Sequence, residues 1–195
     1  MESLGSRELR IPPAPEQDTL SRLEIWIVRH AAARDRETWR LDDAMRPLTE
    51  RGRDRFRTLV ARLGGRVKPP SLIWTSPAVR AVQTAELLAG LEGFRGTVEV
   101  APWLSPEGDV PDAVSAASEL VGRRMAVVGH EPLLSVLAGR LLGLRALPCR
   151  LPKGAVVAIA DREVVFAALP RRAREKHGRI LRSLEALCRA AGDPP

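Results

Sequence analysis

Residues 23–30 read Leu23-Glu24-Ile25-Trp26-Ile27-Val28-Arg29-His30, a short apolar run that stops abruptly at two polar residues. A continuous apolar run of this length predicts a strand that is buried on both faces. Strands of that kind belong to parallel sheets covered by helices. The run therefore predicts a central strand of an α/β sheet, with Arg29 and His30 at its carboxyl end.

The rest of the chain alternates short apolar runs with helical patterns. Further strands are expected at residues 72–75, 97–101 and 125–128, and a terminal hairpin at residues 155–160 and 164–169. Helices are expected from the N-cap Thr49 to Leu63, and over residues 78–91, 133–142 and 173–190. Strands separated by such helices are joined by right-handed crossovers. We therefore expect a three-layer α/β/α sandwich whose mostly parallel sheet carries an antiparallel edge hairpin.

The length of 195 residues suits one ordinary domain, and a hydrophobic content of 45% suits a sizeable core. Residues 1–22 include the proline-rich tip Ile11-Pro12-Pro13-Ala14-Pro15, and we expect them to form a flexible leader. Residues 23–195 are then a single domain, which ends in a basic helix and tail at residues 171–195.

Several classes of protein are excluded by simple patterns. No apolar run approaches the ~18 residues that cross a bilayer, and the N-terminus lacks the apolar stretch of a secretory signal. Cys149 and Cys188 stand 39 residues apart, which fits neither a disulfide framework nor a zinc site. We expect a cytoplasmic protein with reduced thiols and no membrane partner.

The formal net charge of +7 is carried by arginine, since only three of the 31 basic residues are lysines. Such an excess admits nucleic acid, an acidic membrane surface or a phosphorylated substrate as partner. Residues 171–195 alone hold a net charge of +4, which fits a solvated helix face or a surface for an anionic partner. They contain no aromatic side chain on which bases could stack, and this argues against nucleic acid.

Polar residues follow three of the predicted strands directly. The first strand ends in Arg29-His30, the second leads through Thr75-Ser76-Pro77 to Arg80, and the fourth ends in Gly129-His130-Glu131. Parallel strands bring their carboxyl ends to one edge, where ligands of open α/β sheets bind. Two of the three histidines in the chain are therefore expected at that edge.

This grouping suits phosphoryl transfer. A neutral imidazole can attack phosphorus through one ring nitrogen when a hydrogen bond, for example to a backbone carbonyl, fixes the other. Two arginines supply the positive charge that the transferred group needs without a metal, and a second, protonated histidine can add one more donor. We expect neither a metal nor another cofactor.

The same residues also carry a family resemblance. Ile27-Val28-Arg29-His30-Ala31 resembles the Arg-His-Gly signature of the histidine phosphatase superfamily, whose fold is the phosphoglycerate mutase-like fold. Residues 75–84 and 128–132 resemble the family's second-arginine and second-histidine motifs, and residues 46–52 and 104–109 resemble segments of the SixA-type phosphohistidine phosphatases within it. The five segments occur in the family's order between residues 23 and 170.

The resemblance implies specific roles. His30 would be the phosphorylated nucleophile, and Arg29, Arg80 and His130 would form the phosphate pocket. Arg46 and Thr49 would have a supporting role only, and Thr49 is expected in the first place as a plain helix cap.

Two positions depart from the family pattern. Ala31 stands in place of glycine; its N–H should remain available to phosphate, and its methyl group should narrow the approach slightly. Pro106 occupies the place of the usual acidic proton donor, which leaves Glu107 as a candidate acid.

The missing acid favours a phosphohistidine substrate on a signalling or phosphotransfer protein, because a leaving nitrogen can be protonated before its bond to phosphorus breaks. Two alternatives stay open. One is a phosphatase of small phosphate esters or diphosphates, and the other is a non-catalytic module that binds phosphate or an anionic partner. The oligomeric state is left open.

Overall fold

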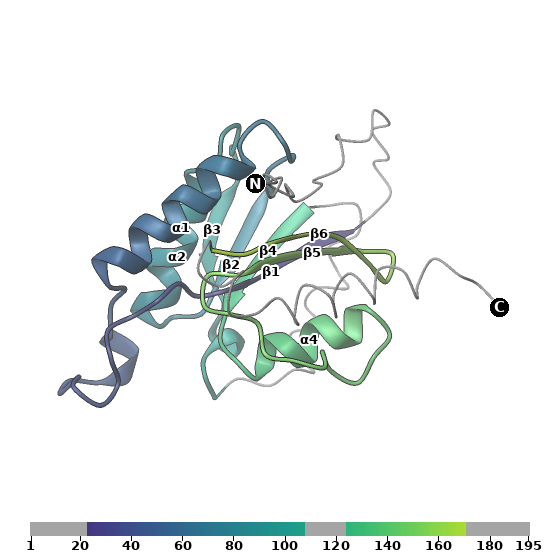
Figure 1. Cartoon of the computed structure of the whole chain (residues 1–195). Coiled ribbons are helices and arrows are strands. Elements are labelled where there is room, and N and C mark those ends of the chain that lie inside the picture. Colours follow the sequence, from purple (N-terminus) through teal and green to yellow (C-terminus); the bar gives the residue numbers. More distant parts are fainter. Residues whose placement is uncertain (1–22, 108–123, 171–195) are drawn as a thin grey trace, which may run out of the picture.

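The computed structural model describes residues 23–107 and 124–170. The leader expected at residues 1–22 and the basic helix expected at 173–190 lie outside the described residues. Six strands form one sheet in the order β3-β2-β4-β1-β5-β6 (Figure 1). The strands are β1 (Glu24–Arg29), β2 (Leu72–Thr75), β3 (Thr97–Val100), β4 (Arg124–Gly129), β5 (Val156–Ala160) and β6 (Glu163–Ala168).

The sheet is parallel from β3 to β1, and β5 and β6 add the antiparallel edge hairpin. Helices α1 (Glu50–Leu63) and α2 (Val79–Ala89) cover one face, and α4 (Leu133–Leu141) covers the other (Figure 1). Two short 3-10 helices, η1 (Asp43–Met45) and η2 (Pro102–Leu104), lie in the connections. The predicted three-layer architecture is therefore confirmed. In the described part of the chain, no helix is both long and apolar enough to cross a membrane.

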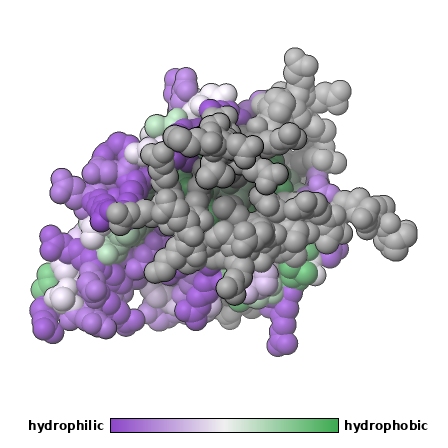
Figure 2. Space-filling model, in the orientation of Figure 1, coloured by the Kyte–Doolittle hydropathy of each residue, from purple (hydrophilic) through white to green (hydrophobic). Residues whose placement is uncertain are grey.

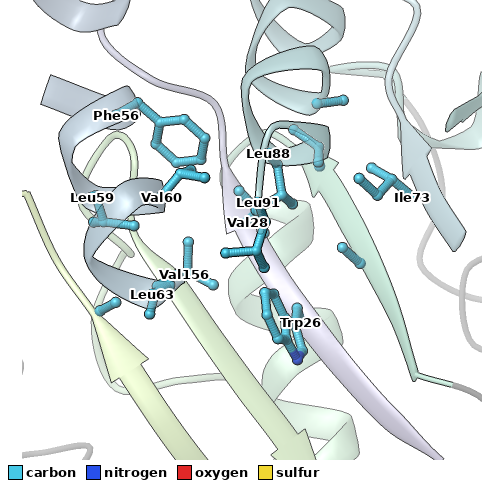
Figure 3. Close-up of a cluster of buried hydrophobic side chains, with 14 of the residues drawn as sticks. Trp26, Val28, Phe56, Leu59, Val60, Leu63, Ile73, Leu88, Leu91 and Val156 are labelled. Atoms are coloured by element: carbon cyan, nitrogen blue, oxygen red, sulfur yellow. The ribbon is translucent and has the colours of Figure 1, made fainter. Parts of the chain in front are cut away.

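Strand β1 is buried on both faces, as its sequence predicts. Trp26 and Val28 point toward α1 and α2, where Phe56 and Leu63 of α1 pack near Val156 of β5 (Figure 3). Ile25 and Ile27 belong to a second apolar cluster on the α4 side. Burying both faces of one strand ties the three layers together.

The register of the central strands sets the position of the site. Arg29 pairs with Gly129, so β1 and β4 end at the same level, and the His30 N–H donates to the Gly129 carbonyl at 3.1 Å. The Ser76 N–H donates to the Val128 carbonyl at 2.9 Å and brings the end of β2 to the same edge. The chain runs outward from β1 through β2 to β3 and then returns to place β4 between β1 and β2. Ligands of open α/β sheets bind where the strand order reverses in this way.

The outer face of α1 accounts for part of the arginine excess. The helix reads ERGRDRFRTLVARL, with Phe56, Leu59, Val60 and Leu63 buried and most of its charged residues directed outward. Figure 2 shows hydrophilic side chains over the side of the molecule where Figure 1 places α1 and α2. These charges solvate the helix and do not form part of a pocket.

Candidate active site

The fold brings His30, His130, Arg29 and Arg80 to one edge of the sheet. His30 follows β1, His130 follows β4, and Arg80 stands in the first turn of α2. The two imidazole rings are 5.1 Å apart between centroids, and their exposed fractions are only 6% and 4%. Two buried histidines facing each other across neighbouring strand ends form the centre of the candidate site.

A hydrogen bond fixes the tautomer of His30. Its Nδ1 lies 2.7 Å from the carbonyl oxygen of Ala31. Because a carbonyl oxygen can only accept, Nδ1 carries the proton and Nε2 keeps the lone pair. The expected contact between the second ring nitrogen and a backbone carbonyl is therefore confirmed. Burial lowers the pKa of His30 to about 3, although the Ala31 carbonyl opposes this shift, so the ring is neutral at pH 7.

His130 is also neutral in the free protein. Burial, and next the charge of Arg80, lower its pKa to about 4, while the carboxylate of Asp43 opposes the change. Its Nε2 lies 2.8 Å from the Ser76 hydroxyl, which also accepts from the Ala78 N–H at 3.3 Å. Burial therefore disfavours the charged ring in the free site, and the protonated second histidine that could add one more donor stays a prediction.

Arg29 is held by the loop that leads into β5. Its Nη1 donates to the carbonyl of Leu151. Burial lowers the pKa of Arg29, and the carboxylate of Glu131 opposes that change. Its Nε is buried and has no hydrogen-bond partner among the described residues. An unpaired buried donor of this kind is costly unless a ligand satisfies it.

Arg80 is 3% exposed and is oriented by Asp43 of η1. Its Nη1 donates to the Asp43 main-chain carbonyl at 2.7 Å, and its Nη2 lies 3.0 Å from the Asp43 carboxylate. Burial lowers the pKa of Arg80, against the raising effect of Asp43. The Nε of Arg80 is likewise buried without a partner in the described part of the chain.

Arg46 reaches the site through the same carboxylate. Its Nε donates to Asp43 Oδ1 at 2.9 Å, and its Nη1 donates to the Arg34 carbonyl at 2.6 Å. One carboxylate thus joins Arg46 to Arg80, which fits the supporting role expected for Arg46. Sequence reasoning missed Asp43, although its spacing of three residues from Arg46 was a usable signal.

Thr49 caps α1, because its hydroxyl accepts from the Gly52 N–H at 3.0 Å. Its own N–H donates to the Ala32 carbonyl at 2.9 Å. A Cβ at Gly52 would collide with that same carbonyl, so only glycine lets the helix approach this closely. Thr49 therefore ties the start of α1 to the segment just after His30 and does not itself reach the imidazole rings.

The expectation for Ala31 is wrong. Its N–H is not available to phosphate, because it donates to the Thr84 hydroxyl at 3.0 Å. The side chain is 2% exposed and packs in the cluster beneath α1 and α2 instead of narrowing the pocket. Thr84 in turn donates to the Arg80 carbonyl at 2.7 Å, and so links the turn after β1 to α2.

Glu131 follows the end of β4, and the sequence pattern alone predicts no role for it. Its carboxylate accepts from the Leu151 N–H at 2.8 Å and from the Ser135 hydroxyl at 2.6 Å. Glu107, the candidate acid, lies in an exposed turn just after η2, and no contact with His30 or His130 is recorded for it in the described residues. Within residues 23–107 and 124–170, no group of three or more His, Cys, Asp or Glu side chains could hold a metal ion.

Comparisons with known proteins agree with this geometry. A protein-family model described as the histidine phosphatase superfamily (branch 1) matches residues 25–104 of this chain. The phosphohistidine phosphatase SixA of Escherichia coli (strain K12) is 32% identical over 123 residues, which are 61% of this chain and 74% of SixA. A structure of the protein histidine phosphatase SixA complexed with tungstate matches with a TM-score of 0.66 and 25% identity, over 76% of this chain and 98% of that one.

A further match is the alpha-ribazole phosphatase from Shigella flexneri, with a TM-score of 0.58 and 21% identity over 75% of this chain and 94% of that one. At this identity the likeness concerns the fold alone. Together with the arginine and histidine side chains at the ends of β1 and β4, the sequence match to SixA leads to one conclusion: the chain belongs to the histidine phosphatase superfamily, branch 1.

Proposed function

We propose that this protein is a phosphatase that transfers a phosphoryl group to His30 and then to water, with the phosphohistidine of another protein as its substrate. The observation that carries the proposal is a buried, neutral His30 whose Nε2 lone pair is free, beside two arginines whose buried Nε donors lack partners among the described residues. A nucleophile and unpaired cationic donors at one place suit the attack on a phosphoryl group.

In the first step, His30 Nε2 forms a bond to phosphorus while the bond from phosphorus to the substrate nitrogen breaks. The electron pair of that bond leaves with the substrate imidazole, which takes up a proton. Arg29 and Arg80 stabilise the negative charge on the phosphoryl oxygens while the phosphoryl group passes from the substrate imidazole to His30. The Nδ1–H bond to Ala31 keeps the ring of His30 oriented and stabilises the positive charge that it gains.

In the second step, water attacks phosphorus, the bond to His30 Nε2 breaks, and inorganic phosphate leaves. His130 is neutral in the free site, and the negative charge of a bound phosphoryl group raises its pKa. The ring of His130 can then donate a hydrogen bond from its N–H to the phosphoryl oxygens. In this scheme arginines supply the positive charge, so turnover should persist in a chelating agent.

The choice of phosphohistidine rests on the leaving group. A nitrogen can be protonated before the bond to phosphorus breaks, whereas an alkoxide needs a proton from a well-placed acid. Glu107, the candidate for such an acid, lies in an exposed turn. The relative SixA is named a phosphohistidine phosphatase. The runner-up is a small phosphate ester, which the same nucleophile and arginines could also bind.

A substrate panel tests the proposal. It compares a phosphohistidine-bearing phosphotransfer protein with phosphoserine, a sugar phosphate and a diphosphate, in the presence of a chelating agent. We expect the phosphohistidine to be preferred, and the His30→Ala variant to lose at least about 1,000-fold in kcat because the nucleophile is absent. A large preference for the esters would overturn the substrate assignment, and turnover by His30→Ala would overturn the mechanism.

A further inference from the structure

Lys153 lies in the loop that leads into β5, directly beside the nucleophile. The next residue, Gly154, donates its N–H to the carbonyls of Arg29 and His30, both at 3.0 Å. Gly154 has a positive φ of 77°, a conformation that glycine adopts without strain. This turn hydrogen-bonds Gly154, the residue next to Lys153, to the end of β1.

The ammonium of Lys153 shares the electrostatic field of the site. Partial burial of its side chain lowers its pKa, and the positive charges of Arg29, Arg46 and Arg80 lower it further, against Asp35. Arg29 of β1, Arg80 of α2 and Arg46, which follows η1, therefore all act on this one ammonium. No hydrogen bond or ion pair is recorded for Lys153 within residues 23–107 and 124–170.

Lys153 also differs from the arginines in exposure. Arg80 is buried and Arg29 is half-buried, whereas Lys153 is an exposed residue. A long, flexible side chain at the edge of the pocket can follow an anion that moves, while a buried guanidinium fork held by backbone carbonyls cannot. Repulsion among four neighbouring cations is relieved when a dianion binds between them.

We propose that Lys153 is a further substrate-binding residue, whose ammonium binds an outward-facing oxygen of the phosphoryl group at the mouth of the pocket. The inference rests on the proposed function, because it assigns the lysine to the same phosphoryl group. Arg29 and Arg80 hold the inner oxygens, and Lys153 closes the solvent side from the loop before β5.

The test uses inorganic phosphate as the probe and isothermal titration calorimetry at low ionic strength. Lys153→Met keeps the length of the side chain and removes the charge, while Lys153→Arg keeps the charge. Lys68→Met is the matched control, since Lys68 is exposed and precedes β2 at the opposite edge of the sheet. We expect Lys153→Met to weaken phosphate binding about tenfold, the loss expected for one charged hydrogen bond. Lys153→Arg and Lys68→Met should stay within about twofold of the parent protein.

The outcomes separate this inference from the proposed function. If Lys153→Met binds phosphate as tightly as Lys68→Met, Lys153 is not a binding residue, whatever the enzyme turns over. If the parent protein hydrolyses nothing in the substrate panel but Lys153→Met still loses phosphate affinity, the proposed function fails and the binding role stands. Thermal unfolding of each variant checks that the fold is intact, which the exposure of Lys153 leads us to expect.

Discussion

The surroundings of His30 prepare it for the nucleophilic role proposed above without a neighbouring base. Burial keeps the ring of His30 neutral, and the carbonyl of Ala31 selects the tautomer whose free lone pair is on Nε2. The first effect comes from the packing around the ring, and the second from the backbone at the end of β1. A histidine elsewhere on the surface would be partly protonated at pH 7 and would present either nitrogen.

Asp43 is the residue whose removal tests how the arginines are positioned. Burial raises its pKa, but the hydrogen bond from Arg46 and the charge of Arg80 outweigh this effect and lower the pKa, so the carboxylate is ionised. Asp43→Asn keeps the main-chain contact with Arg80. Its side chain offers only one acceptor, the amide oxygen, to the guanidinium groups of Arg46 and Arg80. We expect kcat to fall about tenfold, because the orientation of Arg80 is loosened. Phosphate should bind as tightly as before or more tightly, since a negative charge near it is lost.

The matched control is Asp54→Asn, which makes the same charge change on the exposed face of α1, where Asp54 pairs with Arg57. Steady-state kinetics and phosphate inhibition constants provide the measurement. Unchanged kcat in Asp43→Asn would show that Asp43 does not position Arg80 for catalysis.

At the scale of elements, the sequence predicts the positions of those site residues that stand at the ends of strands. His30, Arg29 and His130 each stand within one residue of a strand end, and apolar runs of the length of β1 and β4 are recognisable from composition and periodicity. The grouping of these side chains then follows from parallel pairing. The strand order that makes them neighbours could not be derived, because nothing local encodes which strands pair.

Asp43, Thr84 and Lys153 were missed for a different reason. Asp43 and Lys153 lie in connections without periodicity, and Thr84 looks like any residue of a helix. Their partners are distant in the sequence: Asp43 contacts Arg80, and Thr84 accepts from the Ala31 N–H. The error about Ala31 has the same origin, because a free backbone N–H can be recognised only when the side chains around it are placed.

Glu131 connects three elements and can be tested at that scale. Its carboxylate joins the start of α4, through Ser135, to the loop before β5, through Leu151, whose carbonyl holds Arg29. Glu131→Ala leaves the Leu151 N–H without its acceptor and the Ser135 hydroxyl with only the longer contact to the Cys149 carbonyl, so we expect a loss of about 1–3 kcal/mol in the free energy of unfolding. We also expect kcat/KM to fall about tenfold, because Arg29 loses its support.

Glu131→Gln should recover most of both losses, since an amide oxygen can still accept from the Leu151 N–H. Ser135→Ala is the control, as it removes the contact with α4 and leaves the one with Leu151. Urea unfolding and steady-state kinetics give the two quantities. If Glu131→Ala lost stability but kept the parent kcat/KM, the carboxylate would support the fold without positioning Arg29.

At the scale of the whole molecule, burying two histidines at the site costs stability in acid. In the unfolded chain each histidine has a pKa near ~6.5, whereas the folded pKa values are about 3 for His30 and about 4 for His130. Between these values the unfolded state binds more protons than the folded state. Stability therefore rises with pH from about 3 to 6.5 and falls as the solution is made acidic.

His30→Asn isolates one of these contributions. Between pH 7.5 and pH 5, the free energy of unfolding of the parent protein should fall by about 2 kcal/mol more than that of the variant. This is the effect of one histidine over the roughly 1.5 pH units between its unfolded-state pKa and pH 5. Urea unfolding at each pH, in buffers free of phosphate, measures the difference. Other titrating groups are common to both proteins and cancel. Parallel pH profiles would mean that His30 titrates near its ordinary pKa in the folded protein. Only part of the protein would then hold a neutral His30 at pH 6.5. Activity would rise with pH around that value instead of staying level.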